Sequence, residues 1–205
     1  MILTDKEIRE LCLENSQKPL IAPFKEEYLQ AASYDVSMSG NIRRFGSSVQ
    51  TIRLTDQDVI DEMYEEYNLS EKGTYVLKPG EYILVQLNEK ICIPQNIIAH
   101  LRPRTRFTRA GIMITDQHCN PTYEGYLQVG LYNVSPNAIE LVPDLKIGQL
   151  VFEQLASIPS KEKWYCNKKD AAYQNESEFI GAKFGLNELS PQARRLYEMI
   201  ISGEL

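Results

Sequence analysis

The 205-residue sequence has few of the residues that build metal centres or disulfide frameworks. It contains two histidines, His100 and His118, and four scattered cysteines, none spaced as Cys-x-x-Cys. We therefore expect free thiols and no histidine-rich metal centre. No apolar run approaches the roughly 20 residues that span a bilayer, and residues 1–6 have neither the basic start nor the apolar core of a signal peptide. These absences predict a cytoplasmic protein without a membrane partner.

An excess of positive charge is also missing. Lysine and arginine number 22 against 28 aspartates and glutamates, which gives a net charge of −6 and a pI near 5.1. This balance disfavours a protein that coats nucleic acid by bulk charge, so we expect no nucleic-acid partner. A small anionic ligand is not excluded, because it needs only a local basic cluster. The hydrophobic content of 43% is ordinary for a globular protein with a core.

The middle of the chain has the pattern of a β domain. From residue 75 to residue 155, apolar and polar residues alternate between turn signals rich in proline, glycine and asparagine, and residues 31–45 alternate in the same way. Short strands at this spacing predict a mostly β fold, a distorted barrel or jelly roll, rather than a βαβ fold. Residues 1–163 are expected to form this domain, and residues 164–205 an arm and a helix of the same domain.

Short helices are expected at both ends of the chain. Thr4 and Glu7 have the spacing of a capping box, and Ser190 followed by Pro191 begins a C-terminal helix that Gly203 ends. The acidic residues 55–72 keep helical spacing of their apolar side chains, which predicts a short amphipathic helix with a solvated face.

The densest polar feature is a basic cluster inside the β region. Four arginines and two threonines fall within residues 102–109 of an otherwise acidic chain. Arginine forks match phosphate oxygens in bidentate geometry, and threonine adds neutral donors, so the cluster predicts a polyphosphate ligand. The alternative is an exposed basic edge strand that pairs with the acidic helix.

A tight turn with two tyrosines follows at residues 120–126. Tyr123 and Tyr126 lie at the start of an alternating strand that runs to Asn133. An aromatic hairpin of this kind can stack on a sugar or a base. The alternative is a hairpin whose tyrosines pack in the core.

The order and spacing of several motifs resemble the dCTP deaminase and dUTPase superfamily, and its deaminase branch in particular. The matching segments cover most of the chain: residues 1–8, 33–36, 77–82, 104–111, 120–133, 147–150, and Tyr165 with residues 170–174. The resemblance implies a dUTPase-like β barrel that assembles as a homotrimer with sites between subunits and a C-terminal arm closing over the nucleotide. It also implies a dCTP-like or dUTP-like ligand, with Mg²⁺ bound through the triphosphate.

The resemblance also implies individual roles. Arg104, Thr105 and Arg106 would contact phosphates, and Arg109 would lie near the base and the reacting water. Asn120 would face the deoxyribose, and Tyr123 would pack on the sugar. Backbone groups for the base would come from Gln128, Val129 and Gly130, and the nucleotide site would be completed by Gln149, Tyr165 and Tyr173.

The chain departs from the family at its acidic positions. Gly130 stands where the deaminase branch has a water-activating glutamate, and Asn120 stands where the dUTPase branch has an aspartate. An amide cannot act as a general base near neutral pH. In the arm, Ala172 and Glu176 replace a phosphate-binding lysine and a glutamine.

Asp116 is the candidate to replace the lost catalytic carboxylate, because it lies in the segment before the hairpin. The alternative is an aspartate at the hairpin rim, or one that pairs with Arg106 or Arg109. His118 is better explained as a structural residue than as a catalyst.

Two functions follow from these residues. The first is a hydrolase of pyrimidine deoxynucleoside triphosphates, which deaminates dCTP, releases pyrophosphate from dUTP, or does both. The second is a catalytically silent nucleotide sensor or regulator of the same fold. A zinc-dependent deaminase is excluded, because neither histidine begins His-x-Glu and no Cys-x-x-Cys exists.

Overall fold

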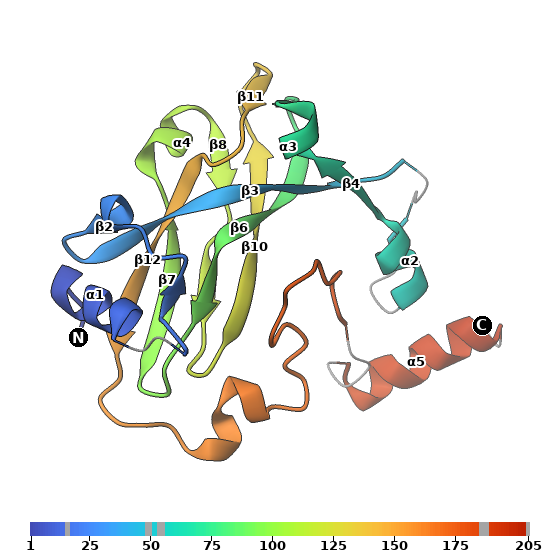
Figure 1. The fold of residues 1–205 in the computed structure, drawn as a ribbon. Helices are drawn as coiled ribbons and strands as arrows, with labels where there is room; N and C mark the ends of the chain where they lie inside the picture. The colour runs from blue at the N-terminus through green and yellow to red at the C-terminus, as the bar shows by residue number, and fades with distance from the viewer. Residues whose placement is uncertain (15–16, 48–50, 53–55, 185–188, 204–205) are drawn as a thin grey trace. The chain divides into compact units, whose positions relative to one another are not determined.

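The computed structural model describes residues 1–14, 17–47, 51–52, 56–184 and 189–203 (Figure 1). Its helices are α1 (Asp5–Leu13), α2 (Gln57–Glu62), α3 (Leu69–Lys72), α4 (Thr105–Arg109) and α5 (Pro191–Ser202), with 3-10 turns η1 (Glu26–Tyr28), η2 (Lys161–Lys163) and η3 (Tyr165–Asn167). Its strands are β1 (Ile21–Ala22), β2 (Leu29–Gln30), β3 (Ser33–Phe45), β4 (Tyr64–Asn68), β5 (Tyr75–Leu77), β6 (Tyr82–Cys92), β7 (Ile97–Pro103), β8 (Ile112–Ile114), β9 (Gln117–Cys119), β10 (Glu124–Asn133), β11 (Ile139–Leu141) and β12 (Lys146–Gln154).

Strand β3 joins the two halves of the main sheet. The strand order is β8-β10-β6-β3-β12-β7-β9, and β1, β2 and β4 pair beside this path. The first part of β3 pairs with β12, whereas the part from Met38 onward pairs with β6, with a register shift between Met38 and Ile42. Figure 1 shows β3 crossing the other long strands at this bend. The predicted mostly β fold, a distorted barrel, is confirmed, and the main sheet curls into a half-barrel.

The core lies on the inner face of the curled sheet. Along β6, every second side chain is buried, and Ile83, Val85 and Leu87 are fully buried. Tyr34 of β3 and Phe152 of β12 are the largest side chains of this core with no exposure. Burial of each such side chain stabilises the fold by about 2 kcal/mol. The alternation seen in the sequence is therefore the division between core and outer face.

The N-terminal helix begins as predicted. The Glu7 carboxylate accepts hydrogen bonds from the backbone nitrogen of Thr4, at 2.7 Å, and from its hydroxyl, at 2.9 Å. Ile8 and Cys12 are its buried residues. The helix ends at Leu13, before Lys18 and Pro19.

The acidic segment is only partly helical. Residues 53–55 lie outside the described residues, and α2 covers Gln57–Glu62 as predicted. The predicted helix is wrong for the following residues, because Tyr64–Asn68 form β4, which pairs with β3. Tyr67 there meets Tyr75 edge to face at 4.8 Å. A sheet edge that supplies backbone partners outweighs the helical spacing of a short segment.

The chain divides into two compact units. The first unit comprises Met1–Arg44 and Glu66–Ile180 and contains most of the barrel. The second comprises Phe45–Glu65 and Gly181–Leu205. Within the second unit, Ile60 is fully buried and Lys183 lies 3.4 Å from Asp61. Helix α5 has the predicted Ser190 cap and ends at Gly203, whose φ is +73°. Within the described residues, no helix is long and apolar enough to cross a membrane.

Candidate functional site

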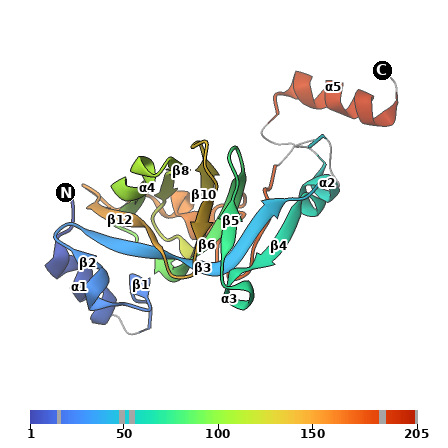
Figure 2. The same ribbon diagram turned by 90° about the horizontal axis from the view of Figure 1, so that it is seen from above.

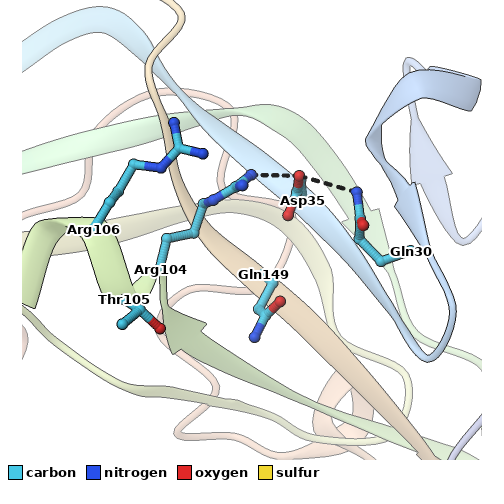
Figure 3. A pocket seen from close by; sticks show the side chains of 6 residues that line it. All are labelled: Gln30, Asp35, Arg104, Thr105, Arg106 and Gln149. Atoms are coloured by element: carbon cyan, nitrogen blue, oxygen red, sulfur yellow. Dashed lines mark hydrogen bonds and ion pairs between the residues drawn. The ribbon is translucent and has the colours of Figure 1, made fainter.

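A polar pocket of about 330 Å³ lies where β7 passes into α4, and we call it the Arg104 pocket (Figure 3). It is lined by Gln30, Asp35, Arg104, Thr105, Arg106 and Gln149. Four of these residues, the three from the basic cluster and Gln149, were predicted to bind nucleotide. Helix α4 packs beside β8 (Figure 2). The alternative of a basic edge strand is wrong, because Thr105–Arg109 are helical.

A buried carboxylate orients Arg104. Asp35 on β3 is 3% exposed and accepts a hydrogen bond from Nη1 of Arg104. Its Oδ2 also accepts from Nε2 of Gln30 at 3.3 Å and lies 3.8 Å from Nζ of Lys146. Because two cations meet one carboxylate, the local charge is positive, and the guanidinium keeps further donors for an anion.

Sequence patterns did not reveal this role of Asp35. It alternates with apolar neighbours in β3 and is expected on the polar outer face, yet it is buried. Its partner Arg104 is 69 residues away in the sequence. Only the pairing of β3 with β12, which also places Gln149 opposite Asp35, brings these groups together.

Asp116 lies outside the Arg104 pocket lining and pairs with a different arginine. Its Oδ2 is 3.2 Å from Nη1 of Arg102, and both side chains are more than half exposed. The alternative in which Asp116 pairs with Arg106 or Arg109 is therefore wrong. Arg109 is exposed at the end of α4, and Arg106 is exposed where it lines the pocket. A role for Asp116 or Arg109 in catalysis stays a prediction.

The hairpin residues form a second region and are not among the residues that line the Arg104 pocket. Asn120 is half-buried in the turn between β9 and β10, and its carbonyl accepts from the Tyr123 nitrogen at 3.1 Å. Tyr123 is 6% exposed and belongs to the core, as the packing alternative held. Its ring meets Tyr165 at 5.6 Å, edge to face.

The segment 164–180, which we call the arm, docks along this hairpin. The Tyr165 nitrogen donates to Pro121 O at 3.2 Å, and the Tyr173 nitrogen donates to the Tyr165 hydroxyl. Further along, the Tyr126 nitrogen donates to Glu176 O at 2.9 Å. The arm therefore adds a short stretch of backbone to the edge of β10.

The next part of the β10 edge carries the backbone groups predicted to meet a base. The Gly130 nitrogen donates to Oγ1 of Thr115 at 2.9 Å, and Gly130 O accepts from the Thr115 nitrogen, also at 2.9 Å. Gln128 O accepts a long 3.4 Å bond from Nε2 of Gln117. Val129, the residue between them, is fully buried. A base that bound at this edge would replace the Thr115 and Gln117 side chains as the hydrogen-bond partner of the β10 backbone.

Tyr82 fills the space above Gly130. A Cβ atom added at Gly130 would lie 2.2 Å from the Tyr82 hydroxyl oxygen. Burial raises the pKa of this phenol, so it stays neutral near pH 7. The position where the deaminase branch has its glutamate thus has no room for a side chain. Nothing in the local sequence indicated that Tyr82 would occupy it.

Glu176 is a buried carboxyl group that sequence analysis noted only as a departure from the family. It is 4% exposed, and its Oε1 accepts from the Ile180 nitrogen at 2.9 Å. The Gln128 side chain, whose Nε2 donates to Oε1 of Gln86 at 3.4 Å, lies beside this carboxyl group. Burial is the main cause that raises the pKa of Glu176 to about 7, and the polar groups of Ile180 and Gln128 oppose it. The polar arm has no periodic pattern from which this burial is predictable.

Protein ligands for a metal ion are not gathered at either region. Within the described residues, no group of three or more histidines, cysteines, aspartates and glutamates could hold an ion. The carboxylate of the Arg104 pocket, Asp35, is engaged by Arg104.

Comparison with known proteins gives one consistent family. The model of the dCTP deaminase-like family matches residues 2–155. The chain is 30% identical over 182 residues to a dCTP deaminase of Natronomonas pharaonis, covering 86% of this chain and 91% of that protein. It is 29% identical over 189 residues to a dUMP-forming dCTP deaminase of Corynebacterium glutamicum, covering 91% and 98%.

A solved structure has the same fold. The crystal structure of 2′-deoxycytidine 5′-triphosphate deaminase from Agrobacterium tumefaciens matches with a TM-score of 0.60 at 20% identity. The match covers 75% of this chain and 48% of that chain, so the chain spans about half of its length. The curled sheet, the basic pocket and these matches together show that the chain belongs to the dCTP deaminase-like family.

Proposed function

We propose that the protein is a hydrolase of pyrimidine deoxynucleoside triphosphates that deaminates dCTP, releases pyrophosphate from dUTP, or does both. The observation that carries this proposal is the Arg104 pocket, where a buried carboxylate holds one arginine fork beside a second arginine, a threonine and a glutamine. Such a set suits the oxygens of a triphosphate. Family membership supports the pyrimidine nucleotide.

The site would be completed by a second copy of the chain. The residues that line the Arg104 pocket include none of the hairpin residues Asn120, Tyr123 and Gln128. One nucleotide that uses both sets would therefore lie between subunits, with phosphates on one and the base on another. This agrees with the homotrimer that the sequence resemblance implies.

Both reactions use one activated water. In deamination, water adds to C4 of cytosine and ammonia leaves; in pyrophosphate release, water attacks the α-phosphorus and pyrophosphate leaves. Arg104 and Arg106 would hold the phosphates, and Arg109 would stabilise charge near the reacting group. Asp116 is the proposed general base. Mg²⁺ on the triphosphate would neutralise part of its charge.

A direct assay tests the proposal. The purified protein is incubated with dCTP or dUTP and Mg²⁺, and ammonia, the uracil nucleotide and pyrophosphate are measured. We expect product from at least one of the two triphosphates. Binding without any product would overturn the enzymatic function, and the lack of any binding would overturn nucleotide recognition as well.

Asp116→Asn tests the general base. If Asp116 activates the water, turnover falls at least about a hundredfold while triphosphate affinity is kept. The control is Asp58→Asn, a carboxylate in the second unit, which should leave the rate unchanged. An unchanged rate in Asp116→Asn would remove this residue from the mechanism.

A second candidate function is a silent nucleotide sensor. It is favoured by Gly130, whose side-chain space Tyr82 fills, and by the amide at Asn120. A sensor would bind the triphosphate at the Arg104 pocket without turnover. The same assay separates it from the hydrolase, because a sensor gives binding and no product.

A further inference from the structure

The arm places one carboxyl group among the side chains predicted to bind the base and sugar. The Glu176 carboxyl group lies beside the Gln128 side chain of β10, and its charge acts on the phenols of Tyr123 and Tyr165. It is 4% exposed, and the structure records no ion pair for it among the described residues. A carboxyl group that is buried without a cation is costly, so such groups point to a function.

Backbone contacts fix Glu176 at this place. Gly125 and Glu176 form a parallel bridge, and the Asn175 nitrogen donates to Glu124 O at 2.7 Å. Gly125 has a φ of +153°, and a Cβ atom there would lie 3.0 Å from the Glu176 nitrogen. The glycine therefore allows the arm backbone to approach, and the Glu176 carboxyl group follows directly beside Gln128.

The side chain beside Glu176 carries the same kind of donor as a cytosine. The Gln128 amide offers an N–H donor, and the exocyclic amino group of cytosine offers the same kind of donor, whereas uracil has an acceptor oxygen there. Glutamate accepts from the cytosine amino group in known base recognition. The carboxylate at the start of β10, Glu124, is already paired with Lys18 and Lys90, and Gly130 has no side chain.

We propose that Glu176 determines base specificity: when a base lies along β10, the Glu176 carboxylate accepts a hydrogen bond from the 4-amino group of cytosine and so selects dCTP over dUTP. This inference rests on the proposed nucleotide site. In this proposal the arm recognises the edge of the base that carries the 4-amino group.

Protonation gives this selectivity a signature. The carboxylate accepts from cytosine, whereas the neutral acid donates to O4 of uracil, so the preference for dCTP falls as the pH falls through about 7. The Glu176 charge acts on Tyr123 from the hairpin and Tyr165 from η3, while Glu124 at the start of β10 is paired with Lys18 and Lys90. Burial raises the pKa of both phenols, so both stay neutral in this range.

The test compares two affinities across pH. Dissociation constants of dCTP and dUTP are measured between pH 6 and pH 8 by rapid filtration within seconds of mixing. Because both nucleotides carry the same triphosphate, its titration cancels in their ratio. We expect the wild type to prefer dCTP about tenfold at pH 8, the size of one charge-assisted hydrogen bond, and to lose most of this preference at pH 6.

Two variants sharpen the result. In Glu176→Gln the new amide both donates and accepts hydrogen bonds. The ratio of the dUTP and dCTP dissociation constants should therefore be near one at every pH, while both triphosphates still bind. Glu178→Gln, an exposed neighbour on the arm, should keep the wild-type profile. The inference would be overturned, with the proposed function intact, if the ratio of the dUTP and dCTP dissociation constants of the wild type did not change with pH. It would also be overturned if Glu176→Gln kept the wild-type ratio. If neither nucleotide binds the wild type, the proposed function falls with it.

Discussion

The Arg104 pocket and the arm-covered edge of β10 are held together by different forces. In the Arg104 pocket, a buried carboxylate on one strand pairs with an arginine 69 residues away. At the β10 edge, backbone hydrogen bonds dock the arm, and the buried Glu176 has hydrogen bonds without a recorded ion pair. The first region is organised by charge, and the second by backbone pairing and a titratable group near neutrality.

This difference predicts a division of labour. In the proposed function, the charge-organised pocket binds the triphosphate, which is common to all nucleoside triphosphates, so its affinity should depend on ionic strength. The arm instead carries a carboxyl group whose proton should respond to pH. Phosphate affinity and base choice should therefore respond to different perturbations.

The largest effect is expected from Arg104→Ala. Loss of the proposed phosphate contact should weaken triphosphate binding at least about a hundredfold. The buried Asp35, which would keep only Lys146 at 3.8 Å as a cation, should cost about 3 kcal/mol of unfolding free energy. Titration calorimetry and urea unfolding measure the two effects. The matched control is Arg102→Ala, whose exposed partner is Asp116 and whose stability cost should be below about 0.5 kcal/mol. Equal costs in both variants would contradict a structural role for the Asp35 pair.

The next effect is expected at Gly130. Gly130→Ala places a methyl group against the Tyr82 ring, with a cost of about 2 to 3 kcal/mol, because the packed outer face must shift. The double variant with Tyr82→Ala should recover most of this cost. A double-mutant cycle by urea unfolding measures the coupling energy. Coupling below about 0.5 kcal/mol would show that Tyr82 does not fill this space.

A smaller effect is expected from pH on arm docking without nucleotide. Glu176 has a folded pKa of about 7, above its ordinary value, so the folded state binds the extra proton and docking weakens as pH rises from about 5 to 7. We expect a loss of about 2 kcal/mol over this range, read from hydrogen exchange of the Tyr126 amide, which bonds Glu176 O. Glu176→Gln should remove the pH dependence. An exchange rate that, after correction for intrinsic exchange, does not change with pH would contradict the burial of this carboxyl group.

The smallest effect separates the two regions by salt. Raising NaCl from about 50 to 500 mM shortens the Debye length from about 14 to 4 Å and should weaken triphosphate binding about tenfold. Exchange of the Tyr126 amide should change less than about twofold, because backbone bonds dock the arm. Equal responses would remove the distinction between the regions.

Local patterns in the sequence predicted much of the fold. Alternation predicted β3, β6 and β10, and the caps at Thr4 and Ser190 predicted the starts of α1 and α5. The pattern failed at Tyr64–Asn68, where a sheet edge outweighed helical spacing. The basic cluster was identified as a phosphate-binding candidate, but its helical conformation was not.

The sequence by itself determined which residues alternate, which helices are capped and where basic charge gathers, because these properties depend on neighbours a few residues apart. The tertiary structure alone decided that Asp35 would be buried against Arg104, that Tyr82 would fill the space above Gly130, and that Glu176 would lie beside Gln128. Each of these contacts joins residues that are distant in sequence. The burial and the pKa of a side chain depend on such contacts rather than on the local alternation of apolar and polar residues.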